Sequence, residues 1–395
     1  MQQLYSPPPQ ERLYCLRMNV VKLLSLVGHV YIEQGCFNSM NNRHVTSKFC
    51  RNILLVGLAS AGLTACNQPP EIQKIEGFAQ GTSYHISYWT SKDVDKETIE
   101  KQFQTKLDSI DKELSTYRDD SYISRFNEKT DTNWQPASKD FIHLIDLARV
   151  INRDTQGCYD PTVSPLFQLW GFQKGTLEVP TAAQISKVKK QMGLDKIQVD
   201  HTGMRVRKVL PHVQLDFSSM GEGYTINKLS KILESDGIHN YLVEFGGDMK
   251  IRGHKPKGQK WRVAIERPIP LEDGVKPYKI VTINDEKGVT LNTSGTYHHS
   301  FDKDGKEYAH ILDPRTGTPV THDLSSATVF SDDPEIGDAW ATAMLCLGPK
   351  VGKAVALRKN LEVFFIRGTD KDAKSFSSEA LSKSQRISFD QGEAK

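Results

Sequence analysis

The sequence predicts an α+β fold with mainly antiparallel sheets and packed helices. Segments with helical periodicity and segments rich in β-branched and aromatic residues occur in blocks, without the strict strand–helix alternation of a doubly wound sheet. The 395 residues are enough to bury one large core or two smaller ones. After the N-terminal region, no apolar run reaches the roughly 20 residues that a membrane-spanning helix requires.

Composition narrows the class of function. The chain is 38% hydrophobic and 25% charged, which is ordinary for a globular protein. Its formal net charge is only +3. A broad nucleic-acid-binding surface would need a marked basic excess, so no nucleic-acid partner is expected.

The N-terminal region has the layout of a secretory signal peptide at 40–65. Three basic residues precede an apolar segment at 53–65, which is too short to span a membrane. It ends in Leu-Thr-Ala-Cys at 63–66, which resembles a bacterial lipobox. This resemblance implies cleavage before Cys66 and acylation of its thiol; the alternative is a cleaved signal with an incidental cysteine.

The signal peptide sets the remaining boundaries. Residues 1–39 are expected to be an upstream extension from a start codon assigned too early, because a signal normally lies at the very N-terminus. Residues 66–74 would form a polar tether, 75–369 the folded domain, and 370–395 a loose polar tail.

Cysteine usage excludes one kind of site. With the leader removed and Cys66 acylated, only Cys158 and Cys346 remain. Two cysteines are too few for a structural zinc site. They could pair in an oxidising compartment, but we expect two buried free thiols.

The first part of the domain predicts one strand and two helices. Residues 74–89 alternate and are rich in aromatics, which is typical of a strand. Apolar residues recur at helical spacing over 93–116. A second helix is expected at 138–156, with Ser138 as its N-cap.

The next part mixes both kinds of element. Thr181 and Gln184 have the spacing of a capping box, so a third helix should extend to about residue 192. Three short β-like runs follow, at 196–200, 204–209 and 213–217. A small-residue turn, in which two glycines bracket Glu222, then leads into a helix at 221–236.

The last part is predicted to be mainly antiparallel. Residues 241–245 and 249–254, joined by Gly-Gly-Asp, indicate a hairpin. Five strand-like runs follow, at 261–268, 279–285, 288–295, 307–313 and 325–330. The fold would close with helices at 335–347 and 351–358 and a strand at 361–368.

Some side chains suggest chemistry. Tyr117 follows a helix, where a tyrosine is either half-buried packing or an aromatic platform for a flat ring. Three histidines, His298, His299 and His310, lie on or beside adjacent strand-like segments. His310, next to the acidic turn at 313–317, is a candidate general base; the alternative is a structural histidine.

Asp338 and Thr342 suggest a metal site. They are four residues apart on a predicted helix and therefore share a face. A carboxylate and a hydroxyl at this spacing can bind one hard cation such as Mg²⁺, which keeps waters and substrate phosphate oxygens as its other ligands. The alternative is an aspartate that only interacts favourably with the helix dipole.

Nine motifs in order resemble those of the ApbE-type FAD:protein FMN transferases, from about Phe78 to about Gly368. They are GTSYHI, LSTYRDDSYISRFN, GCYDPTVSPLFQLWGF, LDFSSMGEGY, NYLVEFGGD, WRVAIERP, TSGTY, HILDPRTGTPV and DAWATAM. The resemblance implies a Mg²⁺-dependent transferase with the FAD site in a cleft. It would split FAD, release AMP and attach FMN through a phosphoester to a threonine of a partner protein (protein flavinylation).

The resemblance also implies roles for individual residues. FAD would contact Tyr117, Cys158, Tyr159, Asp160, Asp216, Glu222 and Ile311. The metal would be held by Ser219, Asp338 and Thr342. His310 would lie near the reacting groups, with Asp313 as the alternative base.

Two departures from the family pattern stand out. Gln80 takes the place of a methionine found in many members, and Glu222-Gly223 that of Lys-Gly, as in a GEG subgroup. Because Mg²⁺ can neutralise the FAD pyrophosphate, the turn need not supply a lysine. Glu222 could then accept hydrogen bonds from adenine or ribose; the alternative is that it only favours the helix N-terminus.

The resemblance and the lipobox together predict a lipoprotein of the bacterial cell envelope, anchored through Cys66, facing the periplasm, and at the inner membrane in preference to the outer. The acceptor would be a subunit of a membrane redox complex. Two alternatives remain open: an FAD pyrophosphatase that yields FMN and AMP, and a flavin-binding lipoprotein. A flavin oxidoreductase has little support, because no GxGxxG opens a βαβ unit.

Overall fold

The computed structural model describes residues 70–172, 177–269, 274–297, 300–303 and 306–390. The chain divides into two compact units, Met1–Asn67 and Gln68–Lys395, and all of the described residues belong to the second. The predicted upstream extension, signal peptide and lipobox therefore lie outside the described residues, as do His298 and His299. None of the described helices combines the length and apolarity needed to cross a bilayer.

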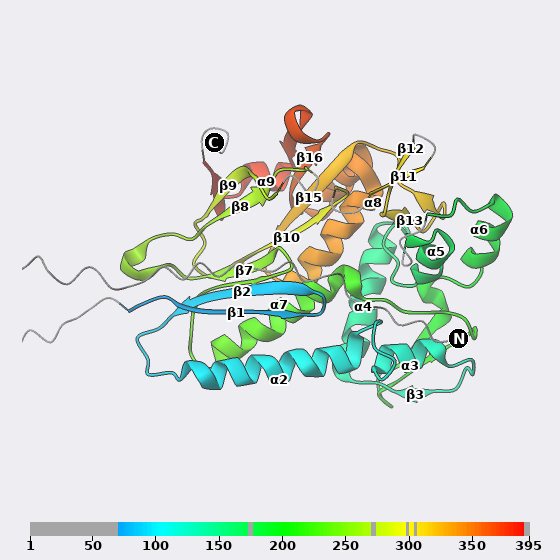
Figure 1. Ribbon diagram of the computed structural model, residues 1–395, viewed down its shortest axis with the longest axis horizontal. Coiled ribbons are helices and arrows are strands. Elements are labelled where there is room, and N and C mark those ends of the chain that lie inside the picture. The colour runs from blue at the N-terminus through cyan, green and yellow to red at the C-terminus, as the bar shows by residue number, and fades with distance from the viewer. Residues whose placement is uncertain (1–69, 173–176, 270–273, 298–299, 304–305, 391–395) are drawn as a thin grey trace, which may run out of the picture. The chain divides into compact units, whose positions relative to one another are not determined.

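The centre of the fold is an eight-stranded sheet in which every neighbouring pair is antiparallel (Figure 1). Its strands, in spatial order, are β1 (Gln73–Ala79), β2 (Thr82–Trp89), β6 (Asn240–Phe245), β7 (Asp248–Arg252), β10 (Val289–Gly295), β15 (Leu324–Ser331), β16 (Glu362–Arg367) and β17 (Lys374–Ser377). The predicted α+β class is confirmed.

Smaller sheets flank the central one. They consist of β8 (Arg262–Glu266), β9 (Pro277–Ile283) and β18 (Ile387–Phe389); of β3 (Gln135–Pro136), β5 (Arg205–Lys208) and β4 (Ile197–Asp200); of β11 (Ser300–Lys303) and β12 (Lys306–Ala309); and of β13 (Leu312–Asp313) and β14 (Thr318–Pro319).

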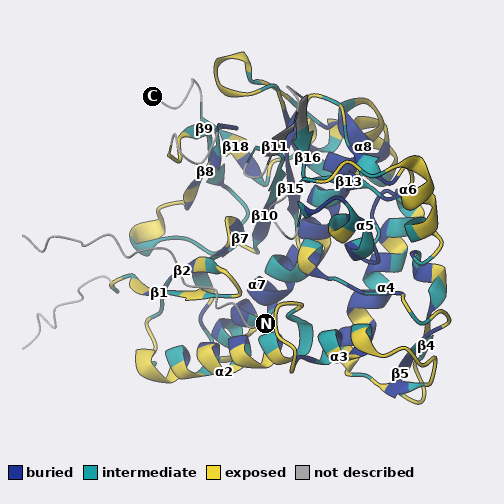
Figure 2. Cartoon of the chain, turned by 45° about the vertical axis from the view of Figure 1, so that its right-hand side comes forward, coloured by how far each residue is buried: buried dark blue, intermediate teal, exposed yellow. Residues whose placement is uncertain are grey.

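The helices are α2 (Lys96–Leu114), α3 (Tyr122–Glu128), α4 (Lys139–Asp154), α5 (Ser164–Leu169), α6 (Ala182–Lys189), α7 (Ser218–Ser235), α8 (Pro334–Lys359) and α9 (Glu379–Lys383). Helices α7 and α8 pack against each other and against the central strands. In Figure 2, α7 is largely dark blue, so it is enclosed between its neighbours.

Alternating side chains of the central strands enter different cores. In β16, Val363 and Phe365 join a core formed with α4 and α8, while Phe364 and Ile366 join one formed with β8 and β9. Burial on both faces explains why β16 is apolar at consecutive positions rather than at alternate ones. Helices α7 and α8 pack on the middle strands of the sheet, and both contribute residues to the candidate site.

Local sequence signals set several helix ends as expected. Ser138 caps α4 by accepting a hydrogen bond from the Phe141 N–H. Thr181 and Gln184 form the predicted capping box of α6. The two helices predicted near the C-terminus are the two parts of α8, which is broken at Gly348 (φ 71°) before Pro349.

Some expectations about secondary structure are wrong. Residues 74–89 are a β1–β2 hairpin and not one strand, because Gln80 and Gly81 adopt positive φ and reverse the chain. Residues 213–217 form no strand; the Asn127 side chain instead pairs with both backbone groups of Leu215. The supposed loose tail forms β17, α9 and β18, since Leu381 and Ile387 supply buried apolar area.

Candidate functional site

A cavity of about 610 Å³ opens between the β1–β2 turn, the end of α2 and the start of α7. This volume lies within the range of small-molecule sites. Its lining residues are Gln80, Gly81, Thr82, Ile110, Asp111, Leu114, Ser115, Thr116, Tyr117, Arg118, Asp216, Phe217, Ser218, Gly221, Glu222 and Phe245. Three of the residues predicted to contact FAD therefore line the same cavity: Tyr117, Asp216 and Glu222.

Tyr117 lies at the mouth of this cavity with 97% of its surface exposed. The half-buried packing role is therefore wrong, and the ring is free to take the part of a platform. Next to it, Arg118 binds Asp120 through two hydrogen bonds of 2.8 Å each. Sequence reasoning did not single out Arg118, although it belongs to the quoted motif LSTYRDDSYISRFN.

Gly221 and Gly223 lie within the first turns of α7, and not in a turn that precedes it. A Cβ added at Gly223 would lie 2.1 Å from the Pro334 carbonyl oxygen, so only glycine allows α7 and α8 to approach this closely. The Gly223 N–H donates to Asp338 Oδ2 at 3.0 Å. The glycine thus fixes the predicted metal ligand Asp338 against the helix that carries Glu222.

Three carboxyl groups gather where α7, α8 and the β6–β7 turn meet. Burial and the charges of Asp248 and Asp338 raise the pKa of Glu222 to about 10. Burial, and then Asp338, also raises the pKa of Asp248 well above its usual range. Burial raises the pKa of Asp338 to about 7, against the lowering effect of two backbone N–H donors.

This carboxyl cluster has the chemistry of a hard-cation site. Within the described residues, no lysine, arginine or histidine forms an ion pair with Glu222, Asp248 or Asp338. Close carboxylates without a cation repel one another, and a divalent ion would relieve that repulsion. Oxygen donors are also the ligands that Mg²⁺ prefers, so the residues present fit this ion.

The other two predicted metal ligands belong to the same neighbourhood. Ser219 Oγ donates to the Tyr159 hydroxyl at 3.0 Å, and burial, with a smaller contribution from the charge of Asp338, raises the pKa of Tyr159. Thr342, one turn beyond Asp338 on α8, has its hydroxyl 3.2 Å from that of Ser294. The ligand assignment itself stays a prediction.

Four of the residues predicted to contact FAD do not line the cavity, and neither does His310. Asp160 accepts hydrogen bonds from the Thr162 N–H and hydroxyl at 2.9 and 2.7 Å, and its buried position raises its pKa. Ile311 packs against the main core. His310 is half-buried between β12 and β13. The other two are Cys158 and Tyr159, and the roles of all five residues stay predictions.

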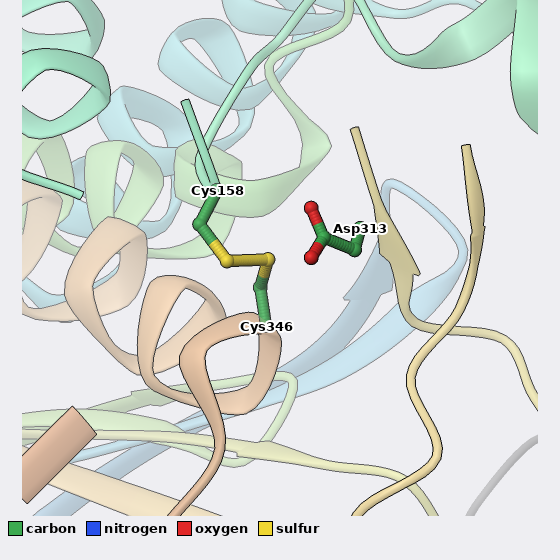
Figure 3. Close-up of side chains that lie close together, drawn as sticks. All are labelled: Cys158, Asp313 and Cys346. Carbon is green, nitrogen blue, oxygen red and sulfur yellow. A yellow bond between two sulfur atoms is a disulfide. The ribbon is translucent and has the colours of Figure 1, made fainter. Parts of the chain in front are cut away.

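Cys158 and Cys346 form a disulfide, so the expectation of two free thiols is wrong. Segments far apart in sequence bring the two Cα atoms to 5.8 Å, which no local pattern could indicate. Figure 3 shows the Asp313 carboxylate facing the two sulfurs, with ligand atoms within 4.8 Å of one another. Because the sulfurs are bonded to each other, this group is not a metal site.

Sequence reasoning missed Asp248. It accepts hydrogen bonds from Asn292 Nδ2 at 2.6 Å and the Thr293 N–H at 2.7 Å, which fix its carboxylate beside Glu222 and Asp338. The signal was available, since Asp248 ends the motif NYLVEFGGD. A Cβ added at Gly246 would meet the Glu222 carboxylate at 2.2 Å, so this glycine leaves room for that side chain.

Known proteins match this chain along most of its length. A family model described as the ApbE family matches residues 80–365. An FAD:protein FMN transferase of Salmonella typhimurium is 36% identical over 84% of this chain and 95% of its own, and one of Escherichia coli is 34% identical over 79% and 91%.

Solved structures of ApbE flavin transferases also resemble this chain. A flavin transferase ApbE from Vibrio cholerae superposes with a TM-score of 0.71 at 30% identity, covering 80% of this chain and 99% of its own. The apo form of a Pseudomonas stutzeri flavinyl transferase ApbE gives 0.72 at 33% identity, covering 80% and 97%. The residues matched by the family model include the segments that line the cavity. On these grounds, the chain belongs to the ApbE family.

Proposed function

We infer that this protein is an FAD:protein FMN transferase, which splits FAD and attaches FMN to a threonine of an acceptor protein. The observation that carries this proposal is the meeting of a nucleotide-sized cavity with an uncompensated carboxyl cluster on the α7–α8 contact. The cavity would hold FAD, and Asp338, one member of this cluster, would help to hold the cation that the FAD pyrophosphate needs. The matched relatives bear the same name.

Binding would use the cavity walls. Tyr117 would stack against a flat ring of FAD at the mouth, where its own ring is exposed. Asp216 and Glu222 would accept hydrogen bonds from amino or hydroxyl groups of the ligand. Gln80 accepts a hydrogen bond from the Thr225 hydroxyl at 3.1 Å, so a polar group occupies this part of the wall.

The chemistry would be positioning plus electrostatics, as in other phosphoryl transfers. Asp338, Thr342 and Ser219 would hold Mg²⁺, which when bound supplies charge neutralisation at the pyrophosphate. The threonine oxygen would bond to the FMN phosphorus as the bond from that phosphorus to the bridging oxygen breaks, and the bridging oxygen would leave with AMP. His310, or Asp313, would take the threonine proton.

We further propose that the chain is a lipoprotein of the cell envelope, anchored through Cys66 and facing the periplasm, at the inner membrane. Its acceptor would be a membrane redox-complex subunit. The support is the signal-like segment 40–65 and its Leu-Thr-Ala-Cys end. Metabolic labelling with a fatty acid, compared between the full chain and Cys66→Ala, tests the anchor; equal labelling of both would exclude it.

The test of the activity is the intact mass of a threonine-containing acceptor after incubation with this protein, FAD and Mg²⁺. A gain of one FMN-phosphoryl group, with AMP released and no gain in EDTA, is expected. FMN and AMP without a mass gain would favour the pyrophosphatase. FAD that stays whole but bound would favour a flavin-binding lipoprotein.

A further inference from the structure

We propose that Cys158 and Cys346 are positioning residues whose disulfide holds three segments of the active site together, so that metal binding and FMN transfer depend on this bond. The claim about FMN transfer rests on the proposed function. The three segments are the loop that follows α4, the part of α8 just before its break at Gly348, and the turn between β13 and β14.

The two cysteines adjoin predicted metal-site residues on both sides of the bond. Cys158 precedes Tyr159, whose hydroxyl accepts from Ser219 at 3.0 Å. Cys346 follows Thr342 by one helical turn on α8. The bond therefore joins the loop that supports Ser219 to the helix that carries Asp338 and Thr342, across a sequence separation of 188 residues.

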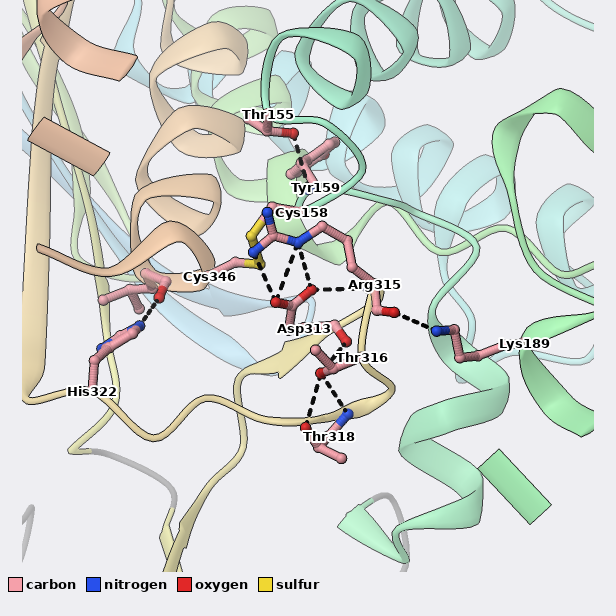
Figure 4. Close-up of polar contacts among 11 residues, drawn as sticks. Thr155, Cys158, Tyr159, Lys189, Asp313, Arg315, Thr316, Thr318, His322 and Cys346 are labelled. Atoms are coloured by element: carbon pink, nitrogen blue, oxygen red, sulfur yellow. Dashed lines mark hydrogen bonds and ion pairs between the residues drawn. A yellow bond between two sulfur atoms is a disulfide. The ribbon is translucent and has the colours of Figure 1, made fainter. Parts of the chain in front are cut away.

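The third segment packs on the same bond. Arg315 donates from Nε and Nη2 to the Asp313 carboxylate at 2.9 and 2.8 Å (Figure 4), and this carboxylate lies within 4.8 Å of the sulfurs. A Cβ added at Gly157 would lie 3.6 Å from Arg315 Cγ, so the loop and the turn are in contact. The turn directly follows His310 and Ile311, two of the predicted site residues.

Irregular backbone adjoins both cysteines. Helix α4 ends at Asp154, and Gln156 and Gly157 then adopt positive φ. Helix α8 breaks at Gly348, just after Cys346, where His322 Nε2 lies 2.7 Å from the Leu345 carbonyl oxygen. Backbone of this kind opens more easily than helix or sheet, so a covalent link has most to restrain here.

The link can be cut chemically. A dithiol such as dithiothreitol attacks one sulfur, a mixed disulfide forms, and the second thiol of the reagent closes to a cyclic disulfide. The protein gains two electrons and two protons as Cys158 and Cys346 become thiols. Because Cys158 and Cys346 are only 3% and 5% exposed, the structure around the disulfide must open before the reagent can reach it.

The first experiment compares Cys158→Ala/Cys346→Ala with the parent and with Val281→Ala. Val281 is fully buried in the β8–β9 core, away from the three segments, so it controls for lost stability. Mg²⁺ binding is measured by calorimetry and FMN transfer by kinetics, at a temperature where all three are folded by circular dichroism. We expect Mg²⁺ affinity and kcat to fall about 10- to 100-fold in the double variant only.

The second experiment reduces the parent protein fully, as judged by alkylation of two thiols, and then reoxidises it. Mg²⁺ affinity should fall on reduction and return on reoxidation, and the double variant should not respond. Full reduction without a change in Mg²⁺ affinity, or a double variant equal to the parent, would overturn the proposal. A parent that binds Mg²⁺ with this redox dependence but transfers no FMN would refute the proposed function alone.

Discussion

Replacement of Asp338 by asparagine should stabilise the metal-free protein while abolishing its response to Mg²⁺. Asp338 is 7% exposed and accepts the Gly223 N–H at 3.0 Å, a hydrogen bond that an asparagine oxygen can keep. What asparagine removes is the cost of a buried negative charge between α7 and α8. A residue that destabilises its own fold is expected where a ligand later compensates.

The size of the gain follows from the pKa of Asp338, which burial raises from 3.8 to about 7. At about 1.4 kcal/mol per pKa unit, this difference corresponds to at most about 4 kcal/mol. Because the folded state holds the proton more tightly, the free energy of unfolding of the parent falls as pH rises from about 4 to 7. The advantage of Asp338→Asn is therefore absent below this window and complete above it.

The assay is urea unfolding at pH 4 and pH 8, in EDTA and in Mg²⁺. In Mg²⁺ at about 100 times its dissociation constant, the parent should gain about 2.7 kcal/mol and the variant nothing. An Asp338→Asn variant that is no more stable than the parent at pH 8 in EDTA would refute the account of the buried charge. A variant that retains Mg²⁺-dependent transfer would refute the ligand assignment.

Three further predictions concern the cavity and its supports. Tyr117→Ala should raise KM for FAD roughly 2- to 10-fold, as expected for one lost aromatic stack, with little change in Tm because the side chain is 97% exposed; steady-state kinetics with unchanged KM would exclude the platform. His310→Ala should lower kcat about 100-fold or more and leave the Kd for FAD unchanged; turnover equal to the parent would remove His310 from the role of base. Asn127→Ala should lower the free energy of unfolding by about 2 to 4 kcal/mol, since both backbone groups of Leu215 lose their partner, and should weaken FAD binding through the neighbouring Asp216; an unchanged urea midpoint would contradict this.

Local chemistry in the sequence was sufficient for most helices and for the motifs. The caps at Ser138 and Thr181 depend only on groups within three residues, so spacing alone indicated them. The antiparallel strands from β6 to β16 were likewise indicated by composition and turn residues. The expectations failed where a partner distant in sequence decides the secondary structure. The Asn127 side chain bonds the backbone of Leu215, before α7, in place of a neighbouring strand. Strands β16 and β9 pair with segments of the C-terminal region, which therefore form strands.

The sequence by itself determined which residue types the site contains, because the motifs place carboxylates, hydroxyls and an aromatic ring in a fixed order. Only the tertiary structure decided how these groups meet. The raised pKa values of Glu222, Asp248 and Asp338 and the bond between Cys158 and Cys346 all arise from segments that are remote in the chain. Charge repulsion and covalent pairing depend on distance in space, and that distance is set by the packing of α7, α8 and the central sheet.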